Sequence, residues 1–128
     1  MRLLLDTCTF LWIIEGGARL SEESRNLFSA PDNEVYLSSV SAWEIAQKHA
    51  LGKLPLPESA KTFVVRQRRL HGIHPLPLDE DSALQVSELP GMHKDPFDRM
   101  LICQAITHGL AIVTPDPLIT RYPVRTLW

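Results

Sequence analysis

Four acidic residues stand where the sequence places the ends of strands or the first turns of helices. They are Asp6, Glu44, Asp98 and Asp116. Carboxylates that meet in one place raise each other's pKa, and such a group is stable chiefly when a divalent cation neutralises it. Ligand sets made only of oxygen select hard ions such as Mg²⁺ or Mn²⁺. If the fold brings these acids together, we expect a metal site.

Each of these acids also has a purely structural explanation. Asp6 and Asp116 are suited to capping the helices that follow them. Two further pairs have the spacing of a capping box, namely Ser41 with Glu44 and Asp95 with Asp98. Ser, Thr or Asn would cap equally well, so the recurrence of carboxylates favours metal binding. For any single acid both explanations stay open.

The elements that must position these acids follow from the apolar runs. Buried strands are expected at residues 2–5, 35–37, 110–114 and 124–127, with a proline-containing edge or irregular strand at 73–78. Helical patterns separate the strands throughout. This alternation predicts an α/β protein with a mostly parallel sheet, and such sheets bind ligands beyond the carboxyl ends of their strands.

All four acids are predicted to reach that edge of the sheet. Asp6 closes the first strand, and Asp116 follows the strand at 110–114. Glu44 lies in the first turns of a helix that ends before Gly52, and Asp98 lies in a helix that begins at Pro96. Four separate segments therefore bring a carboxylate to one crevice.

Size and composition indicate one soluble domain covering residues 1–128. Hydrophobic residues make up 45% and charged residues 22%, close to the averages for globular proteins. The apolar runs are too short to cross a bilayer, and Asp6 interrupts the opening run where a secretion signal would continue. We expect a cytoplasmic protein without membrane association. Cys8 and Cys103 are too few for a disulfide framework and are expected to be buried.

The formal net charge of −2 excludes nucleic-acid binding through bulk charge. Basic residues nevertheless gather between residues 48 and 74, as Lys48, Lys53, Lys61, Arg66, Arg68 and Arg69. This stretch predicts either a local basic surface or an ordinary solvated helix face.

Residues of other types are weaker candidates for catalysis than the four acids. The five histidines lack metal-ligand spacing, and no Ser or Cys stands in a nucleophile elbow. His93 is the histidine of most interest, because it directly precedes the helix of Asp98. A phosphoryl-accepting receiver or phosphatase domain would usually have adjacent acids near the first strand and a late lysine, but no lysine follows Lys94.

Several segments together resemble the PIN-domain family, and specifically its VapC-type toxins. They are Leu3-Leu4-Leu5-Asp6-Thr7, Ser41-Ala42-Trp43-Glu44-Ile45, His93-Lys94-Asp95-Pro96-Phe97-Asp98-Arg99 and Val113-Thr114-Pro115-Asp116. The third segment is the most specific, and the resemblance runs from Arg2 to Trp128. Pro115 and Pro117 on either side of Asp116 depart from the family pattern and stiffen that loop.

The resemblance implies a three-layer PIN-like domain with a mostly parallel sheet of four to five strands. It implies a metal-dependent endoribonuclease, the toxin of a type II toxin–antitoxin system, that forms a homodimer and is controlled by a VapB-type antitoxin. Carried over by position, the catalytic and metal-binding residues are Asp6, Glu44, Asp98 and Asp116, with Mg²⁺ or Mn²⁺ as cofactor. Asp95 then suits an N-cap, and Asp98 is the expected ligand.

Further residues receive roles from their places beside these acids. Thr7 and Thr114 are positioned to hydrogen-bond the ligands or to pack at strand ends. Arg99, Lys48 and Lys53 are the candidates for contact with RNA. The tryptophans Trp12, Trp43 and Trp128 are expected either in the core or on a surface that contacts a partner.

Two other functions remain open from the sequence. A PIN nuclease that cuts DNA or branched structures would need the same acids, because contacts to the ribose 2′-hydroxyl decide that choice. A catalytically silent PIN-like interaction module would be expected to lack one or more of the acids, and all four are present.

Overall fold

The computed structural model describes all 128 residues, and their secondary structure alternates as the sequence predicts. The strands are β1 (Arg2–Leu5), β2 (Glu34–Ser38), β3 (His74–Leu76), β4 (Ala111–Val113) and β5 (Thr126–Leu127). The helices are α1 (Thr7–Ile14), α2 (Glu22–Ser29), α3 (Ser39–Ala50), α4 (Ala60–Leu70), α5 (Glu80–Gln85), the 3₁₀ turn η1 (Val86–Glu88), α6 (Pro96–His108) and α7 (Pro117–Thr120).

The five strands form one sheet in the order β3-β2-β1-β4-β5, and every neighbouring pair is parallel. The expectation of a mostly parallel sheet of four to five strands is confirmed. β3 lies at one edge, where the prolines around it are tolerated. β5 is shorter than the strand expected at 124–127, and it forms the opposite edge.

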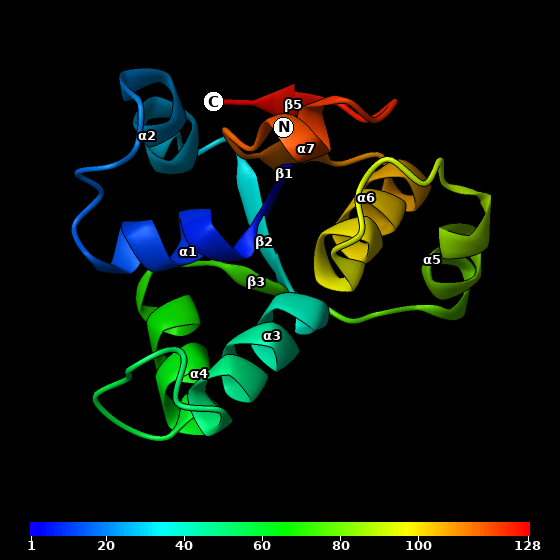
Figure 1. The fold of residues 1–128 in the computed structure, drawn as a ribbon. Coiled ribbons are helices and arrows are strands. Elements are labelled where there is room, and N and C mark those ends of the chain that lie inside the picture. The colour runs from blue at the N-terminus through cyan, green and yellow to red at the C-terminus, as the bar shows by residue number, and fades with distance from the viewer.

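Two hydrophobic cores lie on opposite faces of the sheet, so the molecule has three layers. In β1, Leu3 and Leu5 belong to one core and Leu4 belongs to the other, as the alternation of side chains along a strand requires. Helices α1, α2, α3 and α4 supply the first core. Helices α6 and α7 supply the second, and α5 packs against α6 (Figure 1).

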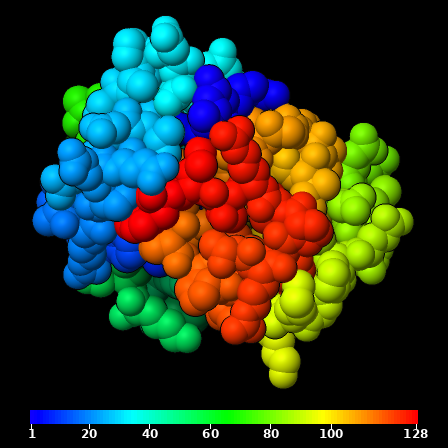
Figure 2. Space-filling view, turned by 90° about the horizontal axis from the view of Figure 1, so that it is seen from above, coloured from blue at the N-terminus to red at the C-terminus, as the bar shows by residue number.

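The two termini lie near each other on the face that carries β5. Figure 2 shows the C-terminal segment in red across this face, with the N-terminal residues in dark blue beside it. The edge strand β5 pairs with β4, while β1 lies between β4 and β2. The first strand is therefore central in the sheet, and its carboxyl end lies in the middle of the sheet's carboxyl edge.

The two cysteines differ in their burial. Cys103 is buried as expected, but Cys8 is exposed, because it lies on the face of α1 opposite the buried residues Phe10 and Ile13. None of the helices is both long enough and apolar enough to span a bilayer.

Candidate metal centre

The candidate site lies at the carboxyl ends of β1, β2 and β4 (Figure 1). Four segments reach this edge: the β1–α1 junction with Asp6, helix α3 with Glu44, helix α6 with Asp98, and the β4–α7 junction with Asp116. Each acid stands next to a helix N-terminus or within its first two turns, as the sequence predicts.

Asp6 caps α1 with one oxygen, and its other oxygen contacts the segment that directly follows β4. Its side chain is 5% exposed. One carboxylate oxygen accepts the backbone N–H of Thr9 at 2.7 Å and caps α1, and the other accepts the hydroxyl of Thr114 at 2.5 Å. Burial raises the pKa of Asp6, and the charge of Asp116 adds to the rise, while both hydrogen bonds oppose it.

Glu44 is equally buried, at 5% exposed, and both of its oxygens are engaged. The hydroxyl of Thr7 donates to Oε1 at 2.7 Å, and the Lys48 ammonium lies 2.5 Å from Oε2. That hydrogen bond is the main reason why the pKa of Lys48 is raised. Ser38 caps α3, whereas Ser41 lies 3.0 Å from the Thr7 hydroxyl. The capping-box explanation for Ser41 and Glu44 is therefore wrong.

Asp98 does not cap α6, because Asp95 caps that helix. One oxygen of Asp95 accepts the backbone N–H groups of Phe97 at 2.9 Å and of Asp98 at 3.1 Å, so Asp95 is the N-cap of α6. The Asp98 carboxylate instead accepts from Nε2 of His93 at 2.9 Å. Burial raises the pKa of Asp98 to about 6, with the charges of Asp95 and Glu44 adding to the rise and His93 opposing it.

Asp116 caps the helix that follows it and is linked to Asp6 through Thr114. One of its oxygens accepts the backbone N–H of Leu118 at 2.9 Å and caps α7. Pro117 occupies the first position of that helix, where its fixed φ is favourable. The backbone N–H of Asp116 donates to the Thr114 hydroxyl at 3.1 Å. Thr114 therefore joins Asp6 to Asp116.

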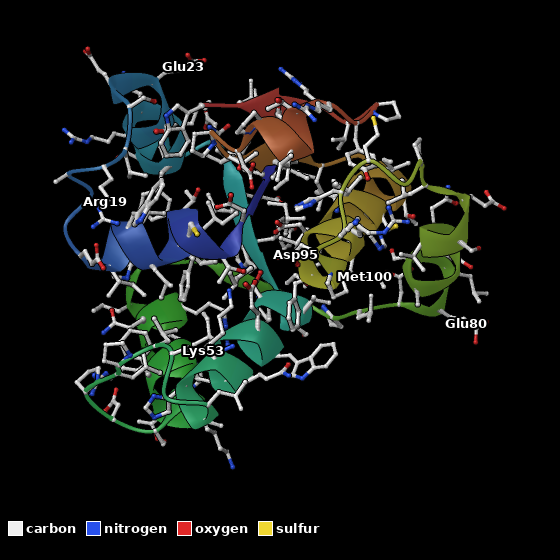
Figure 3. The ribbon with its side chains drawn as sticks, in the orientation of Figure 1. Arg19, Glu23, Lys53, Glu80, Asp95 and Met100 are labelled. Atoms are coloured by element: carbon white, nitrogen blue, oxygen red, sulfur yellow. The ribbon has the colours of Figure 1, made fainter.

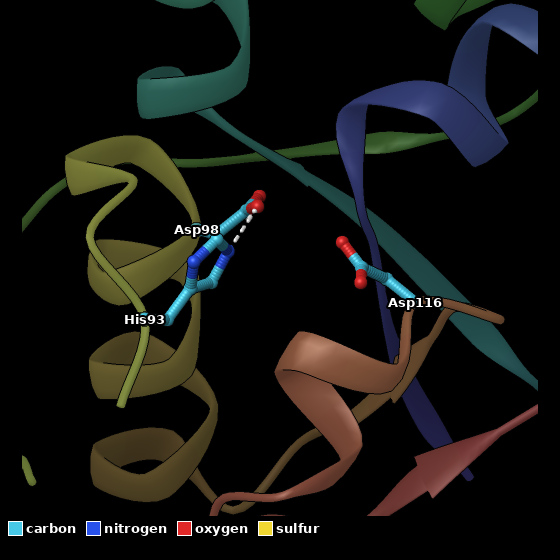
Figure 4. Close-up of side chains that lie close together, drawn as sticks. All are labelled: His93, Asp98 and Asp116. Atoms are coloured by element: carbon cyan, nitrogen blue, oxygen red, sulfur yellow. Dashed lines mark hydrogen bonds and ion pairs between the residues drawn. The ribbon is translucent and has the colours of Figure 1, made fainter. Parts of the chain in front are cut away.

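The structure brings side chains of His93, Asp98 and Asp116 into one cluster. One ligand atom of each lies within 4.8 Å of the other two, and Figure 4 shows the carboxylates of Asp98 and Asp116 on opposite sides of a gap. Ligands on opposite sides of a Mg²⁺ ion are about 4 Å apart. These atoms are therefore spaced to share an ion after small side-chain movements.

Asp6 and Glu44 adjoin this cluster electrostatically. The charge of Asp116 raises the pKa of Asp6, and the charge of Glu44 raises the pKa of Asp98. After burial, the charges of Asp6, Glu44 and Asp98 all raise the pKa of the nearby Cys8 thiol. The charges of Asp116 and Glu44 thus disfavour the ionised forms of Asp6 and Asp98, which is the condition under which a divalent cation binds favourably.

His93 is the site residue that sequence reasoning left out of its set. Its side chain is 9% exposed, and the backbone N–H of Asp95 points at Nδ1 at 3.5 Å. With Nδ1 as acceptor, Nε2 carries the proton and donates it to Asp98. The only signal in the sequence is the position of His93 directly before the α6 cap.

The three basic residues considered for RNA contact occupy different surroundings. Lys48 adjoins the acids through Glu44 and keeps a 48% exposed side chain. Lys53 follows the C-terminal end of α3 (Figure 3). Arg99 donates four hydrogen bonds within the chain, to Val86 O, Pro90 O, His93 O and the Tyr122 hydroxyl. These contacts give Arg99 a role in holding the segment between η1 and α6.

Known proteins resemble this chain in both sequence and fold. Ribonuclease VapC16 of Mycobacterium tuberculosis is 42% identical over 57 residues, which is 44% of this chain and 40% of that relative. The matched region therefore spans less than half of the relative's length.

Two solved complexes resemble the chain over almost its whole length. VapBC2 from Rickettsia felis, bound to a DNA fragment from its promoter, has a TM-score of 0.73 and 16% identity over 99% of this chain and 98% of that one. DNA-bound VapBC from Salmonella typhimurium has a TM-score of 0.71 and 21% identity over 99% and 97%. At such identities the likeness establishes the fold. The family model for the PIN domain matches residues 3–124, and this chain therefore belongs to the PIN-domain family.

Proposed function

We propose that this protein is a metal-dependent endoribonuclease, the toxin of a type II toxin–antitoxin system. The observation that carries the proposal is the burial of ionisable acids at one edge of the sheet, because Asp6 and Glu44 are each only 5% exposed. Burying carboxylates is costly unless a cation or a set of hydrogen bonds compensates. The PIN-domain match and the partial likeness to a VapC ribonuclease support nuclease chemistry at this edge.

The donor set fits a hard divalent ion. We assign Asp6, Glu44, Asp98 and Asp116 as the residues that hold Mg²⁺ or Mn²⁺, since carboxylate oxygens dominate and no thiolate pair is present. The raised pKa values of Asp6 and Asp98 support this assignment, because burial, with a smaller contribution from neighbouring charges, raises them, and a bound cation stabilises the ionised carboxylates. When bound, such an ion supplies Lewis acidity, which polarises a phosphate oxygen and makes water a stronger acid.

The neighbouring side chains orient the acids. Thr114 holds one oxygen of Asp6, and Thr7 holds one oxygen of Glu44. His93 fixes Asp98 by donating from Nε2. Since capping occupies one oxygen of Asp116, its other oxygen is the one we assign to the ion. Partners of this kind set ligand orientation and basicity, and their loss typically weakens metal binding by about 10- to 100-fold.

RNA, a partner protein and a second copy of the chain complete the proposal. Lys48 is the basic residue that we place beside the RNA backbone, because its half-exposed side chain reaches Glu44. Several structures of similar fold are VapBC complexes, which supports control by a VapB-type antitoxin. We further propose that the chain forms a homodimer.

The test is cleavage by the wild type and by Asp6→Asn. Asparagine keeps the oxygen that caps α1, so the fold should persist, which circular dichroism and thermal unfolding would verify. Cleavage of total RNA with Mg²⁺ or Mn²⁺ should fall by more than about 100-fold, because a ligand matters at least as much as the groups that orient it. Chelation by EDTA should abolish wild-type cleavage.

Two controls make the result specific. Asp32→Asn removes an exposed acid before β2 and should leave the cleavage rate unchanged. DNA of matching sequence, assayed in parallel, separates an RNase from a DNA-cutting PIN nuclease. Unchanged RNA cleavage by Asp6→Asn, or equal cleavage by the wild type with and without EDTA, would contradict the proposal.

A further inference from the structure

Trp43 is a large aromatic residue that the fold leaves in water. Its side chain is 61% exposed, although it immediately precedes the buried Glu44 in α3. Its indole packs edge-to-face on Phe97, with ring centroids 5.0 Å apart and an interplanar angle of 72°. Phe97 in turn immediately precedes Asp98 in α6. The aromatic pair therefore bridges the two helices that carry Glu44 and Asp98.

The exposure of Trp43 is not shared by the other tryptophans. Trp12 and Trp128 pack on each other with ring centroids 5.8 Å apart, and both also pack against a core. Exposing an indole forgoes the hydrophobic gain of burial, so Trp43 offers apolar area that a ligand can cover.

The surroundings of Trp43 suit a single flat ligand. One turn away on the same face of α3 are Ser39, Ala46 and Gln47, which are small or polar and exposed. Farther along this face of α3 the exposed apolar residues are Ala50 and, just past the end of the helix, Leu51. A stable protein interface needs about 800 Å² on each partner. Next to the acids, the large apolar surface that α3 offers is the indole, which Phe97 supports.

We propose that Trp43, supported by Phe97, stacks an unpaired nucleobase of single-stranded RNA next to the bond that is cut. This inference rests on the proposed function. Every nucleobase has a π-face that stacks on aromatic side chains. The Trp43–Phe97 pair bridges the helices that carry Glu44 and Asp98, so a base on Trp43 belongs to a nucleotide near these acids. The stacked base holds the strand while the acids act on its backbone.

The experiment is a cycle that pairs changes in the protein with changes in the RNA. The probe is the shortest single-stranded RNA that the wild type cuts at one mapped bond, together with versions in which the nucleotide on either side of that bond is abasic. The variants are Trp43→Ala, Trp43→Phe and the control Leu70→Ala, which removes a 73% exposed side chain from α4. Trp43 is mostly exposed, and thermal unfolding checks that each variant folds.

Trp43→Ala should lower kcat/KM by about 5- to 100-fold, mostly through KM, which is the range that stacking of one base supports. Trp43→Phe should recover most of the loss, and Leu70→Ala should stay near the wild-type value. One abasic position should weaken cleavage by the wild type by a similar factor. On that substrate Trp43→Ala should cause no further loss, because the stacking partner is already gone.

Three outcomes would overturn the inference. If Trp43→Ala cuts the intact RNA as well as the wild type does, nothing stacks there, and the proposed function stands. If Trp43→Ala changes the sedimentation coefficient and loses equal activity on intact and abasic RNA, the indole belongs to a protein interface. If the wild type cuts no RNA with Mg²⁺ or Mn²⁺, the proposed function falls, and the inference falls with it.

Discussion

At Asp6 and Asp116, each carboxylate divides its two oxygens between different tasks. In both residues one oxygen caps the following helix. The second oxygen of Asp6 accepts from Thr114, while capping leaves the second oxygen of Asp116 available to an ion. Capping and metal binding are therefore compatible at one residue, although from the sequence they appear as alternatives. Ser or Thr would supply the cap without the second oxygen, so the proposed metal site accounts for a carboxylate at these positions.

Asp98 gives a pH prediction. Its pKa is raised from 3.8 to about 6, chiefly by burial. The folded protein therefore holds a proton that the unfolded chain releases between these values. The stabilisation from that proton is complete below pH 3.8 and is lost as the pH rises through 6. It amounts to roughly 3 kcal/mol, and partial exposure of the group makes this an upper bound.

Without metal, Asp98→Asn should consequently be more stable than the wild type at about pH 7.5, by roughly 1 to 3 kcal/mol, and equally stable near pH 4. Urea unfolding in EDTA at the two pH values measures the difference. Mn²⁺ should stabilise the wild type at the higher pH and leave Asp98→Asn almost unchanged. The control Asp32→Asn should have the same unfolding free energy as the wild type at both pH values, in EDTA and in Mn²⁺. If Asp98→Asn were less stable than the wild type at the higher pH, the ionised Asp98 carboxylate would not destabilise the folded protein, and the prediction would be wrong.

How far the sequence predicted the site differs from residue to residue. The positions of the four acids follow from local patterns, namely a carboxylate after a strand or within the first turns of a helix. The His93–Asp98 contact does not follow, because it depends on the path of the segment before α6. That path is fixed by distant partners: the Tyr122 hydroxyl accepts the His93 backbone N–H and donates to Pro90 O. The four contacts of Arg99 depend on the same segment, and its place directly after Asp98 in the sequence does not reveal them.

Among the elements, α3 and α6 do most to position the site. Ser38 caps α3 at Val40, and its hydroxyl also donates to the side chain of Gln104 in α6. Gln104 is fully buried, and it donates to the carbonyl of Pro77 at 3.1 Å. Because buried polar groups left without partners are costly, this network fixes α6 relative to α3. The helices that carry Glu44 and Asp98 are thereby held in register.

The start of α6 supplies a prediction about Asp95. Asparagine at this position keeps the oxygen that accepts from Phe97 and Asp98, so Asp95→Asn should match the wild type in stability and in Mn²⁺ affinity. Asp95→Ala removes the cap and should cost about 1 kcal/mol of unfolding free energy. It should also weaken Mn²⁺ binding, because Asp98 lies in the first turn of the same helix. Thermal unfolding and calorimetric Mn²⁺ titration measure the two effects.

The pair of variants separates capping from ligation. If Asp95 bound the ion itself, asparagine would weaken Mn²⁺ binding as strongly as alanine does. Equal losses in the two variants would therefore reassign Asp95 as a ligand.

Most elements could be predicted because residues at or next to their ends determine their boundaries. Pro96 at the first position and Gly109 with a φ of 66° bound α6 as the sequence indicates. The start of α3 was harder, since Ser38, Ser39 and Ser41 are all possible caps, and burial of Ser38 against α6 decides among them. The length of β5 depends on its pairing with β4 alone, which no local pattern encodes.

For the whole molecule, the topology makes one edge of the sheet attractive to a phosphodiester. With the sheet entirely parallel, all carboxyl ends point the same way, and α1, α3 and α6 begin near that edge. Helix N-termini carry about half a positive charge and favour anions. The acids at the same place repel anions unless a cation intervenes. An edge that has both helix N-termini and acids is suited to hold a cation and a phosphate together, as the proposed function requires.

The most direct test of this account is the position of Mn²⁺ in crystals of the wild-type protein, located by anomalous diffraction. We expect an ion at the carboxyl edge of the sheet, bound by oxygens of Asp6, Asp98 and Asp116, with Glu44 bound directly or through water. We also expect this ion to be absent from crystals of Asp6→Asn. An edge that stays empty at saturating Mn²⁺, or an ion bound elsewhere, would contradict the claim that these four acids form one metal site.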